Sequence, residues 1–208
     1  MIDSYVYSHE SALYTLAVIP ILSEITAAHL SVLSTHEMQN MHEITSPSRR
    51  AEFVTARVLL HTIMGHQYEP IQYEPSGKPF MTSHSVSISH TKQFVAAVVS
   101  KNISVAVDIE MYRPTIQRIA SRFMNTQELQ NFTTIEDQTL VWSAKEVLYK
   151  MYNASAEFAQ DYTIQWKKLA QTGTIQTHIH TQTIEKTIEL SYFRTLDYCL
   201  VWGHTTEI

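Results

Sequence analysis

The chain has 208 residues, of which 44% are hydrophobic and 17% charged, and its net charge is −5. This balance is typical of a globular protein and excludes wholesale disorder, while the negative charge argues against a nucleic-acid binder. The single cysteine, Cys199, excludes an intrachain disulfide and a cysteine-based zinc site, and it suits a reducing compartment such as the cytoplasm.

The glycine content excludes the phosphate-binding loops of common nucleotide-binding folds. Only four glycines are present, and they form neither a G-x-G-x-x-G nor a Walker A motif. No apolar run approaches the ~20 residues of a membrane helix, and the first ten residues do not resemble a secretion signal. We therefore expect a cytoplasmic protein without membrane or nucleic-acid partners, which binds any phosphorylated ligand through charged side chains, helix ends or a metal.

Hydrophobic patterning predicts how the N-terminal half is organised. Residues 36–45 are polar and indicate no clear element, and residues 70–84 resemble a loop because of their prolines. The pattern predicts strands over 11–19, 86–90 and 94–99, and a short helix near 21–31.

Ser46-Pro47 is typical of a helix start, with a serine N-cap before a proline in the first turn. The helix should run to about Met64. Arg50 and Arg57 fall on one stripe of this helix. The stripe is either a row of salt-bridged side chains or an anion site near the positive end of the helix dipole.

Residues 103–110 alternate like a strand and follow the apolar run 94–99 after a short turn, which predicts a β-hairpin. Asp108 and Glu110 project from one face of this strand, because side chains two residues apart share a face. Pairing about the turn would place His90 just beyond the ladder, on the Glu110 side. Two neighbouring carboxylates repel unless a cation lies between them, although an exposed acidic strand end is the plainer alternative.

The C-terminal half is predicted to begin with helices and to end as a β-meander. A helix is expected over 115–124, Asn125 and Glu128 form a capping box, and a long helix spans 136–152. The meander is expected from strands near 162–166, 174–181, 186–194 and 197–202.

One face of the long helix combines Trp142, Glu146 and Lys150, which are spaced four residues apart. A solvated Glu–Lys pair at this spacing is common and contributes little. A tryptophan on the same face instead indicates a lined cleft.

Taken together, these residues form an ordered set of motifs. The motifs are Gly77-Lys78-Pro79, Ser87-Ile88-Ser89-His90-Thr91, Val107-Asp108-Ile109-Glu110 and Trp142-Ser143-Ala144-Lys145-Glu146, followed by Lys150. Over residues 46–152 this order resembles the 4′-phosphopantetheinyl transferases of the Sfp type. The chain departs from the family pattern at Ala106, where a glycine is usual, and in 20–45, which contains no lysine or arginine.

The resemblance implies an α+β fold of two similar α/β subdomains related by a pseudo-twofold, with the active site in the cleft between them. We expect residues 1–104 to form the coenzyme A-binding subdomain and residues 105–208 to hold the metal and catalytic residues, together as one compact monomer. The implied reaction transfers 4′-phosphopantetheine from coenzyme A to a serine of an apo carrier protein and releases 3′,5′-ADP. This holo-[acyl-carrier-protein] synthase activity serves fatty acid, polyketide or nonribosomal peptide biosynthesis.

The resemblance also implies a role for each site residue. Asp108, Glu110 and Glu146 would bind Mg²⁺, or Mn²⁺, which prefers a few carboxylates together with substrate phosphate oxygens. Glu146, alone or through a metal-bound water, is the candidate general base for the carrier serine. Lys150 would neutralise the leaving phosphate.

The remaining implied roles concern coenzyme A. His90, counted among the catalytic residues, and Ser89 would bind the pyrophosphate, and Lys78 would contact the phosphates from its loop. Arg50 and Arg57 are the implied partners of the 3′-phosphate.

The acidic carrier protein that the family implies needs a local basic surface on a chain that is itself acidic. Three arginines follow the acidic strand within ten residues, and two of them are spaced to share a helix face. The predicted docking segment contains Arg113, Arg118 and Arg122, with Ile119, Phe123 and Met124 available for apolar contact. A solvated helix face is the alternative.

Two other functions remain open at this point. A transferase-like binding module could keep the fold without catalysis. A metal-dependent phosphohydrolase would release inorganic phosphate without a protein acceptor.

Overall fold

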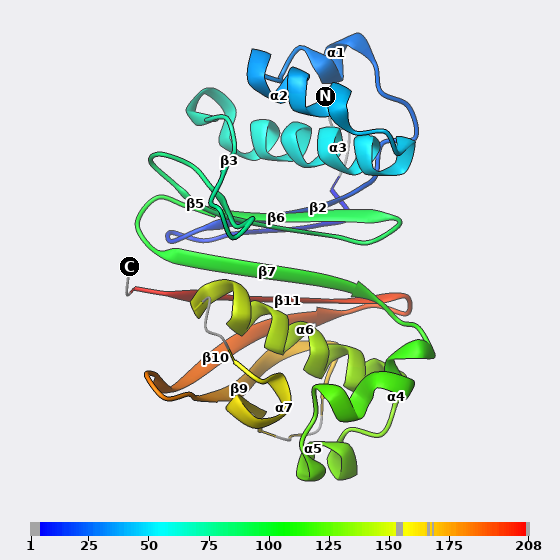
Figure 1. Ribbon diagram of the computed structural model, residues 1–208, viewed down its shortest axis with the longest axis vertical. Helices are drawn as coiled ribbons and strands as arrows, with labels where there is room; N and C mark the ends of the chain where they lie inside the picture. Colours follow the sequence, from blue (N-terminus) through cyan, green and yellow to red (C-terminus); the bar gives the residue numbers. More distant parts are fainter. Residues whose placement is uncertain (1–4, 153–155, 166, 168, 207–208) are drawn as a thin grey trace. The chain divides into compact units, whose positions relative to one another are not determined.

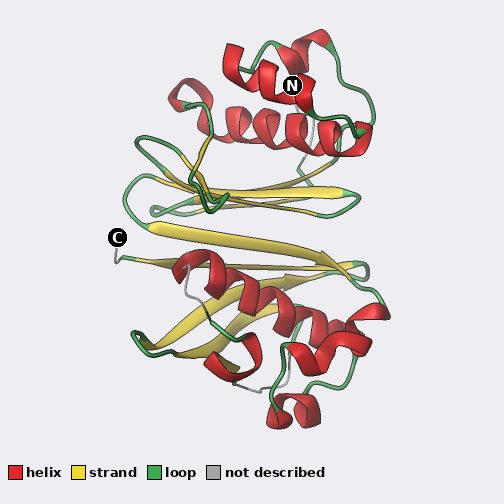
Figure 2. Cartoon of the chain, viewed as in Figure 1, coloured by secondary structure: helices red, strands yellow, loops and turns green. Residues whose placement is uncertain are grey.

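The computed structural model describes residues 5–152, 156–165, 167 and 169–206. The chain divides into two compact units, of which unit 1 extends to Val105 and unit 2 spans Ala106 to Thr205. Each unit is a β-sheet with helices packed on it (Figures 1 and 2). The α+β class expected from the sequence is therefore confirmed.

Unit 1 contains a sheet with strand order β1-β2-β6-β5, and the long helix α3 packs on it (Figure 1). Apolar side chains of α3, including Leu59 and Leu60, meet Ile19 and Val95 of the sheet. The elements are β1 Tyr7–Glu10, β2 Thr15–Pro20, α1 Ala27–Leu30, α2 Thr35–Glu43, α3 Pro47–Met64, a 3₁₀ turn η1 Gly65–Gln67, β3 Gln72–Tyr73, β4 Pro79–Phe80, β5 Ser85–His90 and β6 Phe94–Ser100.

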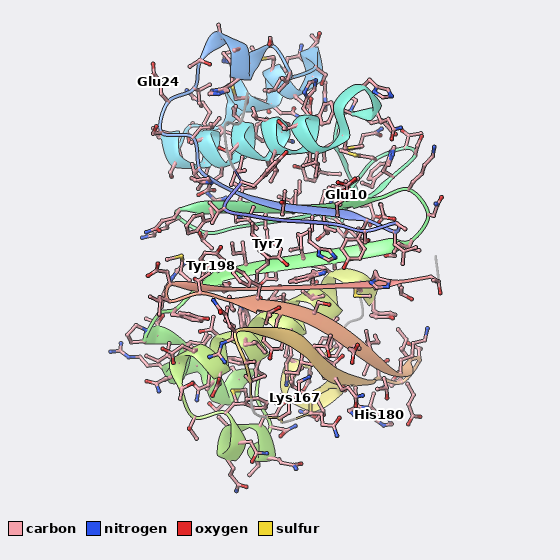
Figure 3. All side chains as sticks on the ribbon, turned by 180° about the vertical axis from the view of Figure 1, so that it is seen from behind. Tyr7, Glu10, Glu24, Lys167, His180 and Tyr198 are labelled. Carbon is pink, nitrogen blue, oxygen red and sulfur yellow. The ribbon has the colours of Figure 1, made fainter. Side chains whose placement is uncertain are left out.

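Unit 2 contains a sheet with strand order β7-β11-β10-β9-β8, and the long helix α6 packs on it. Strand β9 ends at His180 and β11 begins at Tyr198, both labelled in Figure 3. The elements are β7 Ser104–Met111, α4 Thr115–Ile119, a 3₁₀ turn η2 Ala120–Arg122, α5 Thr126–Asn131, α6 Ile135–Tyr152, α7 Phe158–Asp161, β8 Tyr162–Ile164, β9 Thr172–His180, β10 Glu185–Arg194 and β11 Tyr198–Thr205.

Close packing of α6 on β11 depends on Gly203. A Cβ at this position would lie 2.4 Å from Leu190 Cδ2 and 3.2 Å from Met151 Sδ, so any larger residue would displace these two side chains. The absence of a side chain here lets the helix that bears Glu146 lie close to its sheet.

The predicted hairpin between residues 94–99 and 103–110 is wrong. Strand β6 pairs with β2 on one side and with β5 on the other, so it has no free edge for β7. Strand β7 instead lies beside β11 in the second sheet. His90 therefore belongs to the ladder of unit 1, opposite Val95, and the hairpin pairing from which its position beside Glu110 was predicted does not form.

Several helix predictions also need correction. The helix expected near 21–31 is limited to Ala27–Leu30, because the backbone N–H groups of Ile21 and Leu22 donate to the Gln93 carbonyl and the Thr55 hydroxyl. The segment 36–45, for which no element was predicted, is helical as far as Glu43, in the helix that Ser34 caps. The helix expected over 115–124 is interrupted at Ile119, where the backbone leaves the α conformation (φ −110°, ψ 1°).

Other predictions for the chain hold. Helices α3 and α6 begin and end within one residue of the predicted positions, with Ser46 and Thr134 as their N-terminal caps. The β-meander of the C-terminal quarter is present as β8 to β11. Residue 166, at the end of its first predicted strand, lies outside the described residues.

Unit 1 is held together by a buried glutamate at the start of α2. Glu37 completes a capping box with Ser34, and it also accepts hydrogen bonds from the Tyr68 hydroxyl at 2.9 Å and the Ile71 backbone N–H at 3.3 Å. Its charge is matched by Arg57 of α3, whose Nε lies 3.3 Å from Oε1, with both side chains almost fully buried. The glutamate thus joins three separate segments of the unit.

Unit 2 also contains a buried capping-box glutamate that is paired with a cation of the long helix. Glu128 completes a capping box with Asn125 at the start of α5 and accepts a hydrogen bond from the Ile164 N–H at 2.7 Å. Its cation is Lys145 of α6, whose Nζ lies 2.7 Å from Oε2 in a fully buried pair. Each unit therefore fixes its long helix through a buried ion pair with the glutamate of a capping box.

Glu37→Gln should lower the free energy of unfolding by about 3 kcal/mol, because it leaves the Arg57 guanidinium buried without its counter-charge. Urea denaturation with an unchanged slope measures the loss. Glu43→Gln, on an exposed position of the same helix, is the matched control and should stay within about 0.5 kcal/mol of wild type. Equal stability of the two variants would show that the pair does not hold unit 1 together.

Candidate active site

The acidic strand β7 faces α6, and Asp108 is the most deeply buried of its charged residues, at 4% exposed. Its Oδ1 accepts a hydrogen bond from Lys150 Nζ at 2.7 Å, and its Oδ2 accepts one from Ser143 Oγ at 2.7 Å. Lys150 also donates to the Val107 carbonyl at 3.0 Å. Lys150 and Asp108, which belong to two different sequence motifs, therefore hydrogen-bond directly to each other.

Glu110 lies on the same face of β7, as expected from the strand alternation. Its Oε1 accepts a hydrogen bond from Trp142 Nε1 at 3.2 Å. The indole packs edge-on against Phe123 at 5.1 Å and lies 5.6 Å from the ring of Phe158. Trp142 is therefore not on a solvated helix face, and in line with the cleft predicted from its position it lines a pocket of about 200 Å³ together with Glu110.

Their surroundings disfavour the ionised forms of Glu110 and Glu146, the two glutamates that interact with Asp108. Burial first, and the charge of Asp108 second, raise the pKa of Glu110 to about 7. The same causes raise the pKa of Glu146, with Lys150 opposing them. One lysine therefore does not balance the acidic cluster, and additional positive charge would stabilise its ionised form.

The donor set suits a hard divalent cation that shares its coordination with a substrate. In the described part of the chain, no three carboxylate, imidazole or thiol groups are gathered closely enough to form a ready-made metal site. Mg²⁺ does not need one, since it is usually bound by one or two carboxylates with phosphate oxygens and water. Asp108 with Glu110 or Glu146 can provide such a partial site, and the assignment of these three ligands stays a prediction.

Unit 1 contains a separate pocket of about 410 Å³ beside α3. Its wall is mainly apolar and aromatic, including Phe53 and Tyr73, and Arg49, Arg57 and Glu52 add charge. His90 Nε2 lies 2.9 Å from Glu52 Oε2. The volume and lining suit an organic ligand with an anionic group.

The three arginines of α3 occupy different environments. Arg57 is 2% exposed and contributes to the pocket lining, and besides its ion pair with Glu37 it donates to the Phe53 carbonyl at 3.2 Å and the Tyr73 hydroxyl at 3.1 Å. Arg50 donates to the Ile44 carbonyl at 2.7 Å and is not part of the pocket lining. Arg49, which the sequence analysis did not single out, is exposed and lines the pocket. Its position in the first turn of α3 was the available signal.

The other residues predicted to bind coenzyme A are only partly brought together. His90 lines the pocket, whereas Ser89 points to the opposite face of β5, as neighbouring strand residues must. Lys78 follows a turn in which Gly77 adopts a positive φ of 85°, and the pocket lining includes Gly77 and Pro79 but not the lysine. The roles of Ser89 and Lys78 stay predictions.

The predicted docking segment needs a correction. Phe123 and Met124 are buried, at 1% and 2% exposed, in the core of unit 2, so they cannot offer apolar contact to a partner. Arg118 and Arg122 are exposed, but the break at Ile119 separates them into α4 and η2, so they do not share one continuous helix face. Arg113 is also exposed, and it lines a small pocket of about 200 Å³ together with Glu110.

Among the described residues, no helix combines the length and the apolar character needed to span a membrane.

Both units match models of the family that the sequence motifs resemble. Residues 104–200 match the family described as the 4′-phosphopantetheinyl transferase superfamily, and residues 37–100 match the 4′-phosphopantetheinyl transferase N-terminal domain. The chain is 25% identical over 140 residues to the 4′-phosphopantetheinyl transferase HetI of Nostoc sp. strain PCC 7120, covering 58% of the chain and 59% of HetI. It is 24% identical over 139 residues to slr0495 of Synechocystis sp. strain PCC 6803, named as a candidate 4′-phosphopantetheinyl transferase, covering 58% of the chain and 56% of that relative.

Proposed function

Because the chain belongs to the 4′-phosphopantetheinyl transferase superfamily, we propose that it transfers the 4′-phosphopantetheine of coenzyme A to a serine of an apo carrier protein. The second product is 3′,5′-ADP. The observation that carries the proposal is the cluster of Asp108, Glu110 and Lys150 at the interface of β7 and α6, inside the segment that matches the superfamily. The matches span less than two thirds of the two relatives, so their activity is proposed for this chain on the strength of this cluster.

The cation in this proposal is Mg²⁺ or Mn²⁺, held by Asp108 with Glu110 and Glu146. When bound, it supplies positive charge to the pyrophosphate and to the carboxylates whose pKa is raised. Asp108 is the central ligand, because it is the residue whose charge disfavours ionisation of both glutamates.

The transfer itself requires a base and a counter-charge. Glu146, alone or through a metal-bound water, is the proposed general base that accepts the proton of the carrier serine. The serine oxygen forms a bond to the phosphorus that bears pantetheine, and the bond from that phosphorus to the oxygen of the departing 3′,5′-ADP breaks. Lys150, whose side chain is 26% exposed beside Asp108, balances the charge on the leaving phosphate.

The nucleotide end of coenzyme A is proposed to occupy the pocket of unit 1. Phe53 and Tyr73 provide a surface for a base, Arg49 provides positive charge for phosphate, and His90 lines the same wall. Arg57 shapes this wall through its hydrogen bond to Tyr73.

Asp108→Ala and Glu146→Ala should each reduce turnover by ~10²-fold or more, by analogy with the loss of one preorganised electrostatic group. Intact mass of an apo carrier protein incubated with coenzyme A and Mg²⁺ measures the gain of one phosphopantetheine group. Glu136→Ala, an exposed substitution on the same helix, is the control and should retain activity. Near-wild-type turnover of the first two variants in saturating Mg²⁺ would refute the site, and phosphate release without an acceptor would instead identify a phosphohydrolase.

Both Arg49 and Arg57 line the pocket, and we propose the exposed Arg49 as the partner of the 3′-phosphate, whereas the resemblance implied Arg50 and Arg57. We expect Arg49→Ala to lose most of the preference for coenzyme A over dephospho-coenzyme A, about tenfold in the ratio of the two kcat/KM values. Arg50→Ala is the neighbouring control and should keep the preference. The reverse result would show that the pocket does not bind the 3′-phosphate.

The carrier protein is proposed to dock on the arginines that follow β7. The double substitution Arg118→Glu with Arg122→Glu should raise the KM for an acidic carrier several-fold and leave the KM for coenzyme A unchanged. Lys167→Glu, exposed elsewhere on unit 2 (Figure 3), controls for overall charge. If the double variant and the control behave alike, or if the salt dependence of carrier KM is unchanged, the docking surface lies elsewhere.

A further inference from the structure

Ser143 lies directly behind the acidic strand and contacts its most buried carboxylate. The side chain is completely buried, and its hydroxyl donates to Asp108 Oδ2 at 2.7 Å. A buried carboxylate oxygen without a donor is costly, so this hydrogen bond holds the carboxylate in one orientation.

The second oxygen of Asp108 is held by a different residue of the same helix. Lys150 Nζ lies 2.7 Å from Oδ1, two helical turns after Ser143. The serine and the lysine hold different oxygens of Asp108, so together they restrict the orientation of its carboxylate.

We propose that Ser143 is a positioning residue for the divalent cation, because it fixes the orientation of the Asp108 carboxylate that binds the ion. The inference rests on the proposed function, which supplies the cation. Without the hydroxyl, the carboxylate can rotate and offer both oxygens to Lys150, and the lysine then competes with the ion. Partners that orient metal ligands in this way typically contribute 10- to 100-fold in affinity.

The test is a titration with Mn²⁺, followed by the electron paramagnetic resonance signal of the free ion, without coenzyme A or carrier. Ser143→Ala should bind Mn²⁺ about 10- to 100-fold more weakly than wild type, and Ser143→Cys, a small side chain with a weak donor, should be intermediate. Thr177→Val is the matched control, since it removes a buried hydroxyl that donates to the Ile188 carbonyl in the same unit. Its Mn²⁺ affinity should equal that of wild type.

Equal Mn²⁺ affinity of wild type and Ser143→Ala would overturn the inference. An equal loss of affinity in Thr177→Val would also overturn it, because the effect would then be a general loss of packing. Mn²⁺ binding that depends on Ser143, in a wild-type protein that modifies no carrier, would support the inference while contradicting the proposed transfer reaction.

Discussion

A buried glutamate must be matched by a cation, and in each unit of this protein the long central helix supplies it. Glu37 is matched by Arg57 of α3, and Glu128 by Lys145 of α6. Because each glutamate also completes a capping box and accepts a backbone N–H from a later segment, one carboxylate fixes a short helix, a long helix and the chain that follows. Breaking such a pair is costly, so the position of each long helix on its sheet is strongly determined.

The same electrostatic requirement shapes the candidate active site on the other side of α6. Asp108 is buried with Lys150 on one oxygen and Ser143 on the other, but this arrangement does not balance Glu110 and Glu146. The two glutamates are left with raised pKa values, and Trp142 restrains the first of them. The buried Glu128–Lys145 pair holds α6 in place, and α6 and β7 together present a carboxylate cluster with too little positive charge. A site that recruits a cation and a polyphosphate requires such a shortage of positive charge.

The three arginines of helix α3 lie in different environments. Arg57 forms the buried ion pair with Glu37 and also contributes to the pocket lining, whereas Arg49, in the first turn, lines the same pocket from an exposed position. His90 reaches the pocket from β5, but its neighbour Ser89 cannot, because strand residues alternate between faces. Residue type alone therefore does not show which side chains of a helix reach a pocket.

The sequence by itself determined the family, the α+β class, both long helices and the shared face of Asp108 and Glu110, because motif order and local periodicity are written in the chain. The Ser34–Glu37 capping box was equally readable and would have revealed α2. Only the tertiary structure decided that β7 pairs with β11 and not with β6. Both edges of β6 are already paired, with β2 and with β5, so a third strand cannot pair with it. The alternation of residues along a strand does not show which strand it pairs with. Burial of Arg57, Phe123 and Met124, and the contact between Ser143 and Asp108, were likewise decided by packing between segments far apart in sequence, because local periodicity does not show which segments will meet.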